Sequence, residues 1–292
     1  MPAAEEAVAP VVVAVAADAD ETASTIHNPL PHIMNIKTII ASTLLLSAVP
    51  AIAGSTAPSL GDTQLVTTTD SGWRVSTSMY GWFTRLDGDM TFRGNTVPVD
   101  VPFNKIFDNL KFTFMGLVEV GKGRWSFMSD LFYARLEPSV STGTADFDSQ
   151  IEQFIGNFAV FYNVLETSTT RFDAYAGARV NWMETDVKIR SNAPGFTGFD
   201  ESAEKTWIDP IIGFRVHHDI NDKWFIRALA DIGGFGVSSD ITWQGMASLG
   251  YHLTDKASVG LGYRGIGTDY SSGGTTYDVI SPGLLLGLEY RI

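Results

Sequence analysis

Apolar and polar residues alternate along most of the chain after Trp73. The last segment shows the pattern best: every second residue from Ile280 to Ile292 is aliphatic, aromatic or proline, while Glu289 and Arg291 lie between them. A period of two residues predicts a β-strand with one apolar face. The chain after Trp73 is therefore predicted to be all-β.

Ten segments carry this alternation, and we predict a strand in each; a count of eight strands is the alternative. They lie near residues 73–86, 111–121, 124–136, 149–165, 170–189, 204–219, 223–237, 241–253, 257–268 and 277–292. Most connections alternate between short turns and longer loops, and the longer ones are 87–110, 137–148, 190–203 and 269–276. An even number of long antiparallel strands with short turns at one end predicts a closed up-and-down transmembrane β-barrel, with both termini in the periplasm.

A soluble β-sandwich or a lipocalin-like barrel is the alternative interpretation. Arginine and aspartate residues fall on the predicted inward face of the strands, where a soluble core rarely holds charges. After Trp73 the sequence contains no apolar run long enough for a transmembrane helix. Together these observations favour a barrel that crosses a membrane with its strands.

A secretory signal peptide is predicted near the start of the chain. It begins with Met34 and the basic Lys37, continues with a short apolar run, and ends on small residues. We interpret the residues before it as a disordered upstream extension, with Met34 as the true start, and the residues after it as a polar leader. The predicted organisation is upstream extension 1–33, signal peptide 34–53, periplasmic leader 54–72 and outer-membrane barrel 73–292.

Composition narrows the function classes. The 292 residues include no cysteine, which excludes disulfides and a thiol nucleophile. The formal net charge of -13 argues against nucleic acid as a partner, because phosphate binding needs a basic surface. All tryptophan, tyrosine and phenylalanine residues lie at or after Trp73, so the aromatic side chains belong to the predicted barrel.

From Trp73 to Ile292 the chain resembles the small bacterial outer-membrane β-barrel proteins, the group that includes OmpA-like and OmpW-like barrels. The signal peptide, the alternating strands and the final LLLGLEYRI carry this resemblance. That ending looks like the signal read by the barrel-assembly machinery, although here Ile292 is last and the aromatic Tyr290 lies two residues before it. The resemblance implies the outer membrane of a Gram-negative bacterium. The implied partners are outer-membrane lipids and lipopolysaccharide, and the barrel-assembly machinery during insertion.

Charged residues on the inward face are the main candidates for a site. Ten strands leave an interior that side chains can mostly fill, so we predict a structural ion-pair network that plugs the lumen; a path for solutes is the alternative. The predicted lumen residues are Arg74, Glu119, Asp130, Asp173, Arg179, Asp209, Arg215, Arg227, Asp231, Arg264, Glu289 and Arg291.

Partners for several of these charges are predicted from the expected pairing of strands. Across the turn near Asn221, Arg215 is expected to face Arg227, and the two would need carboxylates, which we assign to Asp231 and Asp209. Closure of the barrel by its first and last strands is expected to bring Arg74 near Glu289.

The longest predicted loop, residues 87–110, contains one stretch with helical spacing. After Pro102, four apolar residues recur at i, i+3, i+4 and i+7, which predicts a short amphipathic helix. We expect this helix to cover or partly plug the barrel mouth; a surface helix that rests on the rim is the alternative. The predicted lid residues are Phe103, Ile106, Phe107 and Leu110.

Two further patterns suggest chemistry but are weak. The acidic residues from Asp87 to Asp108 do not fit a calcium loop, because Pro98 stands where the pattern requires glutamate, and we expect no metal site. The His217–His218–Asp219 run lies at a predicted short turn, where its histidines point to opposite faces, and His252 lies near another such turn. We interpret all three histidines as interfacial residues.

The sequence therefore predicts a protein that is not an enzyme and has no cofactor. We expect a mostly plugged, charge-lined lumen and a structural or surface-interaction role. The alternative is a narrow, porin-like channel for small or hydrophobic solutes, gated by the 87–110 loop. We find no equivalent of the paired carboxylates and Asp/His pair of the omptin outer-membrane proteases.

Overall fold

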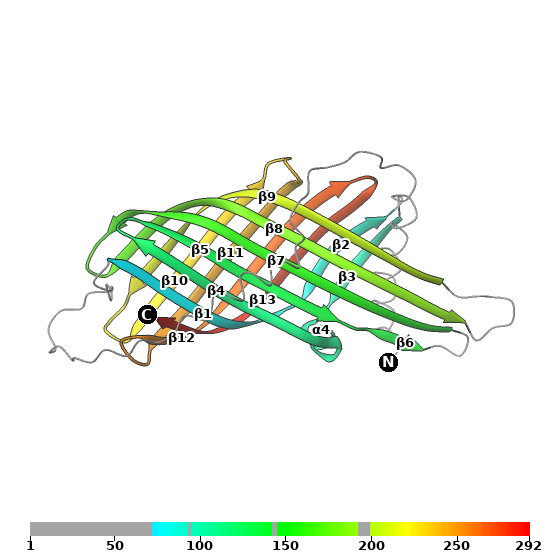
Figure 1. Ribbon diagram of the computed structural model, residues 1–292, viewed down its shortest axis with the longest axis horizontal. Helices are drawn as coiled ribbons and strands as arrows, with labels where there is room; N and C mark the ends of the chain where they lie inside the picture. Colours follow the sequence, from blue (N-terminus) through cyan, green and yellow to red (C-terminus); the bar gives the residue numbers. More distant parts are fainter. Residues whose placement is uncertain (1–71, 93–94, 142–144, 192–198) are drawn as a thin grey trace.

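A computed structural model describes residues 72–92, 95–141, 145–191 and 199–292 (Figure 1). Within these ranges the chain forms a barrel of ten antiparallel strands, as predicted. The barrel strands are β1 (Trp73–Thr84), β4 (Leu110–Lys122), β5 (Trp125–Leu136), β7 (Ala145–Glu166), β8 (Thr170–Ser191), β9 (Phe199–Asp219), β10 (Trp224–Gly234), β11 (Ser239–His252), β12 (Ala257–Ser272) and β13 (Thr275–Arg291). The predicted upstream extension, signal peptide and most of the leader lie outside the described residues.

The barrel closes through its first strand. Strand β1 pairs with β4 on one side and with β13, the last strand, on the other, and every other barrel strand pairs with its neighbours along the chain. Each strand of the ring therefore has a partner strand on both sides, which is what a sheet needs in order to cross lipid.

The two faces of each strand differ as the sequence pattern predicts. On β13, the outward Leu284, Leu286 and Leu288 are each more than half exposed, whereas Leu285 and Glu289 point into the barrel. Exposed aliphatic and aromatic side chains recur in the same way on the outer face of β10 and β12. Large apolar side chains exposed all around a closed barrel suit a lipid environment rather than water.

Aromatic residues mark the end of the barrel where β1 begins and β13 ends. Trp125 packs on Tyr162 and Trp224 packs on Tyr251, with ring centroids 4.8 Å apart in each pair. Both pairs are at least partly exposed, as an aromatic belt at a membrane interface would be. We call this end of the barrel the terminus end.

The segment predicted as a long loop is more ordered than expected. It contains a hairpin, β2 (Leu86–Phe92) and β3 (Asn95–Val101), followed by the helix α4 (Phe103–Asn109), which was predicted. Strand β2 continues the line of β1 along β13, and the inward Met90 and Val99 pack against Val279. A short strand, β6 (Ser139–Ser141), pairs with β7 in the second predicted loop. The apolar side chains of the hairpin explain why it extends the wall instead of forming an irregular loop.

The pairing between β1 and β4 is the shortest in the ring, with seven residue pairs from Trp73–Lys122 to Met79–Gly116. Beyond Met79, both strands continue along their other neighbours. There the main-chain N–H of Trp82 donates to the Met115 sulfur at 3.1 Å. This stretch, which we call the β1–β4 seam, is therefore held by side chains.

Among the described residues, no helix is long and apolar enough to cross a membrane.

Candidate functional site

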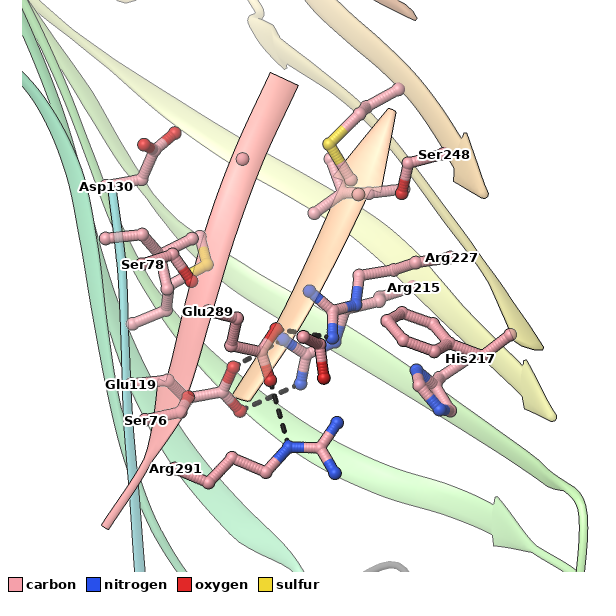
Figure 2. Close-up of a pocket in the computed structure, with 18 of the residues that line it drawn as sticks. Ser76, Ser78, Glu119, Asp130, Arg215, His217, Arg227, Ser248, Glu289 and Arg291 are labelled. Atoms are coloured by element: carbon pink, nitrogen blue, oxygen red, sulfur yellow. Dashed lines mark hydrogen bonds and ion pairs between the residues drawn. The ribbon is translucent and has the colours of Figure 1, made fainter. Parts of the chain in front are cut away.

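A cavity of about 270 Å³ lies inside the barrel at the terminus end (Figure 2). Its mouth is bordered by the turn that contains Glu166 and Thr167 and by Ile292. Its inner end is formed by Tyr80 and Arg264. We call this cavity the vestibule.

Two clusters of charges lie on the vestibule wall. In the first, Arg215 on β9 bridges two carboxylates, with Nη1 at 2.6 Å from Glu119 Oε2 and Nη2 at 2.8 Å from Asp173 Oδ2. The guanidinium also lies over the ring of Phe161, 4.1 Å from its centroid. Arg171 reaches the same Asp173 through Nε at 2.8 Å. Each carboxylate is thus neutralised by at least one arginine.

The second cluster centres on Glu289, near the end of β13. Its carboxylate lies 2.8 Å from Arg227 Nη2 and 3.0 Å from Arg291 Nε. Figure 2 shows these side chains beside the Arg215–Glu119 pair, so the two clusters together line one region of the lumen. Charge-assisted hydrogen bonds to two guanidinium groups offset the cost of placing this carboxylate in the lumen.

A third cluster closes the inner end of the vestibule. Arg264 Nη2 lies 2.8 Å from Asp130 Oδ2 and 2.7 Å from Gln244 Oε1. The Tyr80 hydroxyl donates to the same Asp130 carboxylate at 2.5 Å. Arg264 and Asp130 are buried, and they join strands on opposite sides of the ring.

The fourth cluster lies farther along the barrel and is sealed from solvent. Arg179 has a fully buried side chain, and its Nη2 lies 2.8 Å from Asp231 Oδ1. Its other nitrogens donate to Asn157 and Thr242, and the Tyr175 hydroxyl donates to Asp231 at 2.9 Å. A buried charge pair is tolerated only when its remaining donors are satisfied, as they are in this cluster.

Apolar side chains fill the lumen between and beyond the charges. One buried cluster consists of Met128, Ala159, Phe161, Tyr175, Ile211 and Leu229. A second consists of Trp82, Phe132, Ala134, Ile155 and Ile266, and Trp82 meets Phe132 edge to face at 5.6 Å. Charged and apolar clusters therefore fill successive parts of the lumen.

The predicted lumen residues lie inside the barrel, but two of them have no ion-pair partner among the described residues. Arg74 donates from Nη2 to the Gly123 carbonyl at 2.7 Å. The buried Asp209 accepts from the main-chain N–H and the hydroxyl of Ser239, at 2.8 and 2.7 Å. The other predicted residues take part in the four clusters described above.

The predicted partners were wrong for three arginines. In the observed register Arg215 lies opposite Leu229, and Arg227 lies opposite His217. Their carboxylates come from β4, β8 and β13 rather than from Asp209 and Asp231. Glu289 is likewise bound by Arg227 and Arg291 and not by Arg74. An arginine side chain can reach across a narrow lumen, so neighbouring strands do not determine its partner.

Sequence reasoning missed the uncharged members of these clusters. Tyr80, Asn157 and Gln244 each bind a charged side chain directly. All three occupy inward positions of the alternation, next to or opposite predicted charges. A polar residue at an inward position of the alternation is the sequence signal that could have identified these members of the clusters.

Two of the predicted lid residues, Phe103 and Phe107, pack on each other with ring centroids 5.7 Å apart. Phe103 packs edge to face on Phe83, an exposed residue of β1, with ring centroids 5.4 Å apart. Phe107 is 60% exposed, whereas Leu110 packs against the inner cluster that contains Trp82. Among the described residues, the lining of the vestibule includes none of the four.

The histidines at the terminus end are bound within the protein. His217 Nε2 lies 3.1 Å from Asp219 Oδ1, and its ring stacks on Phe225. On the other side of Phe225 lies the ring of His252, whose Nδ1 is 2.8 Å from the Ser258 hydroxyl. In the part of the chain that the structure describes, no group of three histidine, aspartate or glutamate side chains is arranged to hold a metal ion.

Comparison with solved structures finds similar outer-membrane barrels. The protease OmpT from Escherichia coli aligns with a TM-score of 0.49 at 11% identity, over 79% of this chain and all of that one. Ail, the attachment invasion locus protein of Yersinia pestis, aligns with a TM-score of 0.33 at 11% identity, over 76% of this chain and 99% of that one. Neisserial surface protein A gives a TM-score of 0.32 at 14% identity, with 76% and 98% covered. The sequence matches no family model and no curated protein.

The fold is that of an outer-membrane β-barrel. The closed ring of ten strands and its apolar outer face support this assignment. At these identities and TM-scores the similarity carries no information on activity.

Proposed function

We propose that the protein is a non-conducting outer-membrane barrel with a structural or surface-interaction role. The observation that carries the proposal is the Arg179–Asp231 cluster inside the lumen, a fully buried, hydrogen-bonded ion pair whose members and partners come from β7, β8, β10 and β11. An open channel would keep such charges in contact with water, as the walls of wide porins do.

The packing on either side of this pair supports a closed lumen. The Arg264–Asp130 cluster lies at the inner end of the vestibule. The buried apolar cluster that contains Trp82 and Phe132 also lies inside the barrel. A ten-stranded ring has an interior that side chains can mostly fill. We propose that the two kinds of cluster together stop ions as well as larger solutes.

We further propose that the terminus end faces the periplasm. The turns at this end are short, while the strands extend farther at the opposite end. Outer-membrane barrels place their short turns on the periplasmic side. The proposed partners are outer-membrane lipids and lipopolysaccharide around the barrel, and the barrel-assembly machinery during insertion.

We also propose that the protein is not an enzyme. The lumen carboxylates Glu119, Asp130, Asp173, Asp231 and Glu289 are each held by arginine. A carboxylate in such a pair is poorly placed to act as a general acid or base, because the arginine occupies its oxygens.

Planar-bilayer conductance tests the closed lumen. We expect the refolded barrel to give no resolved single-channel steps, and the Arg179→Ala/Asp231→Ala double variant to give small steps, because both large side chains are removed together. Lys188→Ala is the matched control, since Lys188 is exposed and pairs with Asp200. Resolved steps of equal size from the unmodified protein and the double variant would instead support the narrow channel.

A further inference from the structure

We propose that the vestibule at the terminus end binds a small organic anion through arginine side chains at its mouth. This inference goes beyond the closed-lumen proposal, because a ligand can enter a blind cavity without passing through the barrel. The cavity of about 270 Å³ is close to the lower end of the size range of small-molecule sites.

The side chains of the lining favour an anion. They include six arginines against five carboxylates, although the whole chain has a formal charge of -13. The charged side chains of the lining are Arg74, Arg171, Arg215, Arg227, Arg264, Arg291, Glu119, Asp130, Glu166, Asp173 and Glu289. Arginines gathered in a cavity of an acidic protein concentrate anions locally, since the low-dielectric walls focus the field.

Several hydrogen-bond donors in the vestibule are unused. Arg171 and Arg291 bind their carboxylates through Nε, and their Nη atoms have no hydrogen-bond acceptor among the described residues. Arg74 binds a single main-chain carbonyl.

Three serine hydroxyls extend this set of donors. Ser76, Ser78 and Ser248 line the same cavity and are labelled in Figure 2. Within the described part of the chain their hydroxyl groups make no hydrogen bond to protein. A ligand there can therefore gain hydrogen bonds without breaking any of the ion pairs.

The geometry of these donors defines the ligand chemistry. A guanidinium group presents N–H donors in a planar fork that matches the two oxygens of a carboxylate or a phosphate. The vestibule therefore suits a compact molecule that carries one of these oxyanions, with the serines available to its hydroxyl groups. Four of the five lining carboxylates are already held by arginine, and Glu166 at the mouth is the exception.

Isothermal titration calorimetry of the detergent-refolded barrel tests the site. The probes are inorganic phosphate, succinate and the neutral molecule glycerol. We expect saturable binding of phosphate or succinate that weakens as sodium chloride is added, and no binding of glycerol. The two oxyanion probes distinguish a phosphate from a carboxylate ligand, and binding of either supports the site.

Variants at the mouth locate the binding. We expect Arg74→Gln and Arg291→Gln each to weaken binding about tenfold, because each removes a charged hydrogen bond to the ligand. Arg291→Lys keeps the charge and loses the fork, so its affinity is expected to lie between those of the unmodified protein and Arg291→Gln. Arg124→Gln is the matched control, since Arg124 is an exposed arginine at the same end that does not line the vestibule.

Two controls show whether a loss of binding comes from misfolding or from a change in the closed lumen. The heat-dependent gel mobility of each variant shows whether it has folded, and conductance measured on the same preparation reports the closed lumen independently. Failure of phosphate and succinate to bind the folded barrel would overturn the proposal. Binding that is unchanged in Arg74→Gln and Arg291→Gln would overturn it as well.

Discussion

At the scale of single residues, the main feature is how this barrel keeps charges in its interior. The Arg179 guanidinium is shared between Asp231, Asn157 and Thr242, so its donors are used in several directions. Arg215 is held in a similar way between two carboxylates and an aromatic ring. Burial of an ion pair costs desolvation energy, and such bridging offsets that cost only while all partners remain.

Loss of one partner is therefore expected to destabilise the barrel. Asp231→Asn preserves the side-chain volume but leaves the buried Arg179 without a carboxylate, at an expected cost of about 3–5 kcal/mol in the free energy of unfolding. Urea unfolding, followed by the heat-dependent gel shift, measures this change. Asp148→Asn breaks an exposed pair with Arg190 and is expected to change the free energy of unfolding far less, because solvent screens the pair. Equal effects of the two substitutions would contradict a special role for the buried pair.

The candidate site was predictable in part at this scale. Alternation was enough to place charged residues such as Arg215 and Glu289 inside the barrel. Their partners were not predictable, because a long side chain selects a carboxylate across the lumen, and that choice depends on the tilt and stagger of the closed ring. The partner of Asp209 was also not predictable from the sequence, since it is Ser239, the first residue of β11.

At the scale of elements, the β1–β4 seam differs from the rest of the wall. The seven residue pairs between β1 and β4 end at Met79, and in the seam beyond them the Trp82 N–H has a sulfur acceptor in place of a carbonyl. Thioether sulfur is a weak hydrogen-bond acceptor. The main-chain amides of the seam are thus the least protected from solvent exchange in the ring.

Hydrogen exchange is expected to detect this difference. Amides of residues 80–84 that point toward β4 should exchange sooner than those of residues 261–266, which lie in the long β12–β13 ladder. Mass spectrometry of the deuterated protein in detergent provides the comparison. Equal protection of the two segments would show that side chains close the seam as firmly as a main-chain ladder does.

The hairpin of β2 and β3 shows why some elements escaped prediction. Its alternation is interrupted by Gly88 and Pro98, which read as loop residues in the sequence. In the fold, Gly88 is required by contact, because a Cβ atom there would collide with the main-chain oxygen of Asp278. Pro98 lies in β3, which is unpaired on one side, so its missing N–H donor is tolerated. The sequence alone does not show that a strand can hold these two residues, because this depends on the strands that lie beside β2 and β3.

At the scale of the whole molecule, the apolar outer face and the closed ring determine the behaviour expected in solution. Large side chains such as Leu261 and Leu288 are more than half exposed on that face. Water would not support such a surface, whereas lipid or detergent would cover it.

Refolding of residues 54–292 is therefore expected to need detergent. The folded barrel should migrate faster than the unfolded chain on a gel of unheated samples, and heating should abolish the difference. Heated samples of the same preparation are the control. A protein that folds without detergent and shows no mobility shift would contradict the membrane assignment.

The sequence predicted most of the global architecture. The strand count, antiparallel order and closed barrel were predictable from alternation and connection lengths, because few folds satisfy both. The starts of β7 and β9 were not: these strands begin at Ala145 and Phe199, whereas the predicted segments began at residues 149 and 204. In β8, predicted as 170–189, the alternation of Val187 and Ile189 with charged residues continues close to the observed end at Ser191.

The length of these strands has a consequence for what the barrel can present. Strand β8 has 22 residues, about 70 Å of extended chain, whereas about 10 residues suffice to cross a bilayer. Even with the tilt of barrel strands, we expect the surplus to extend the β-sheet wall beyond the lipid at the end opposite the termini. A binding partner that meets this end finds a surface already ordered by main-chain ladders. Recognition there loses little conformational entropy, in contrast to capture by flexible loops.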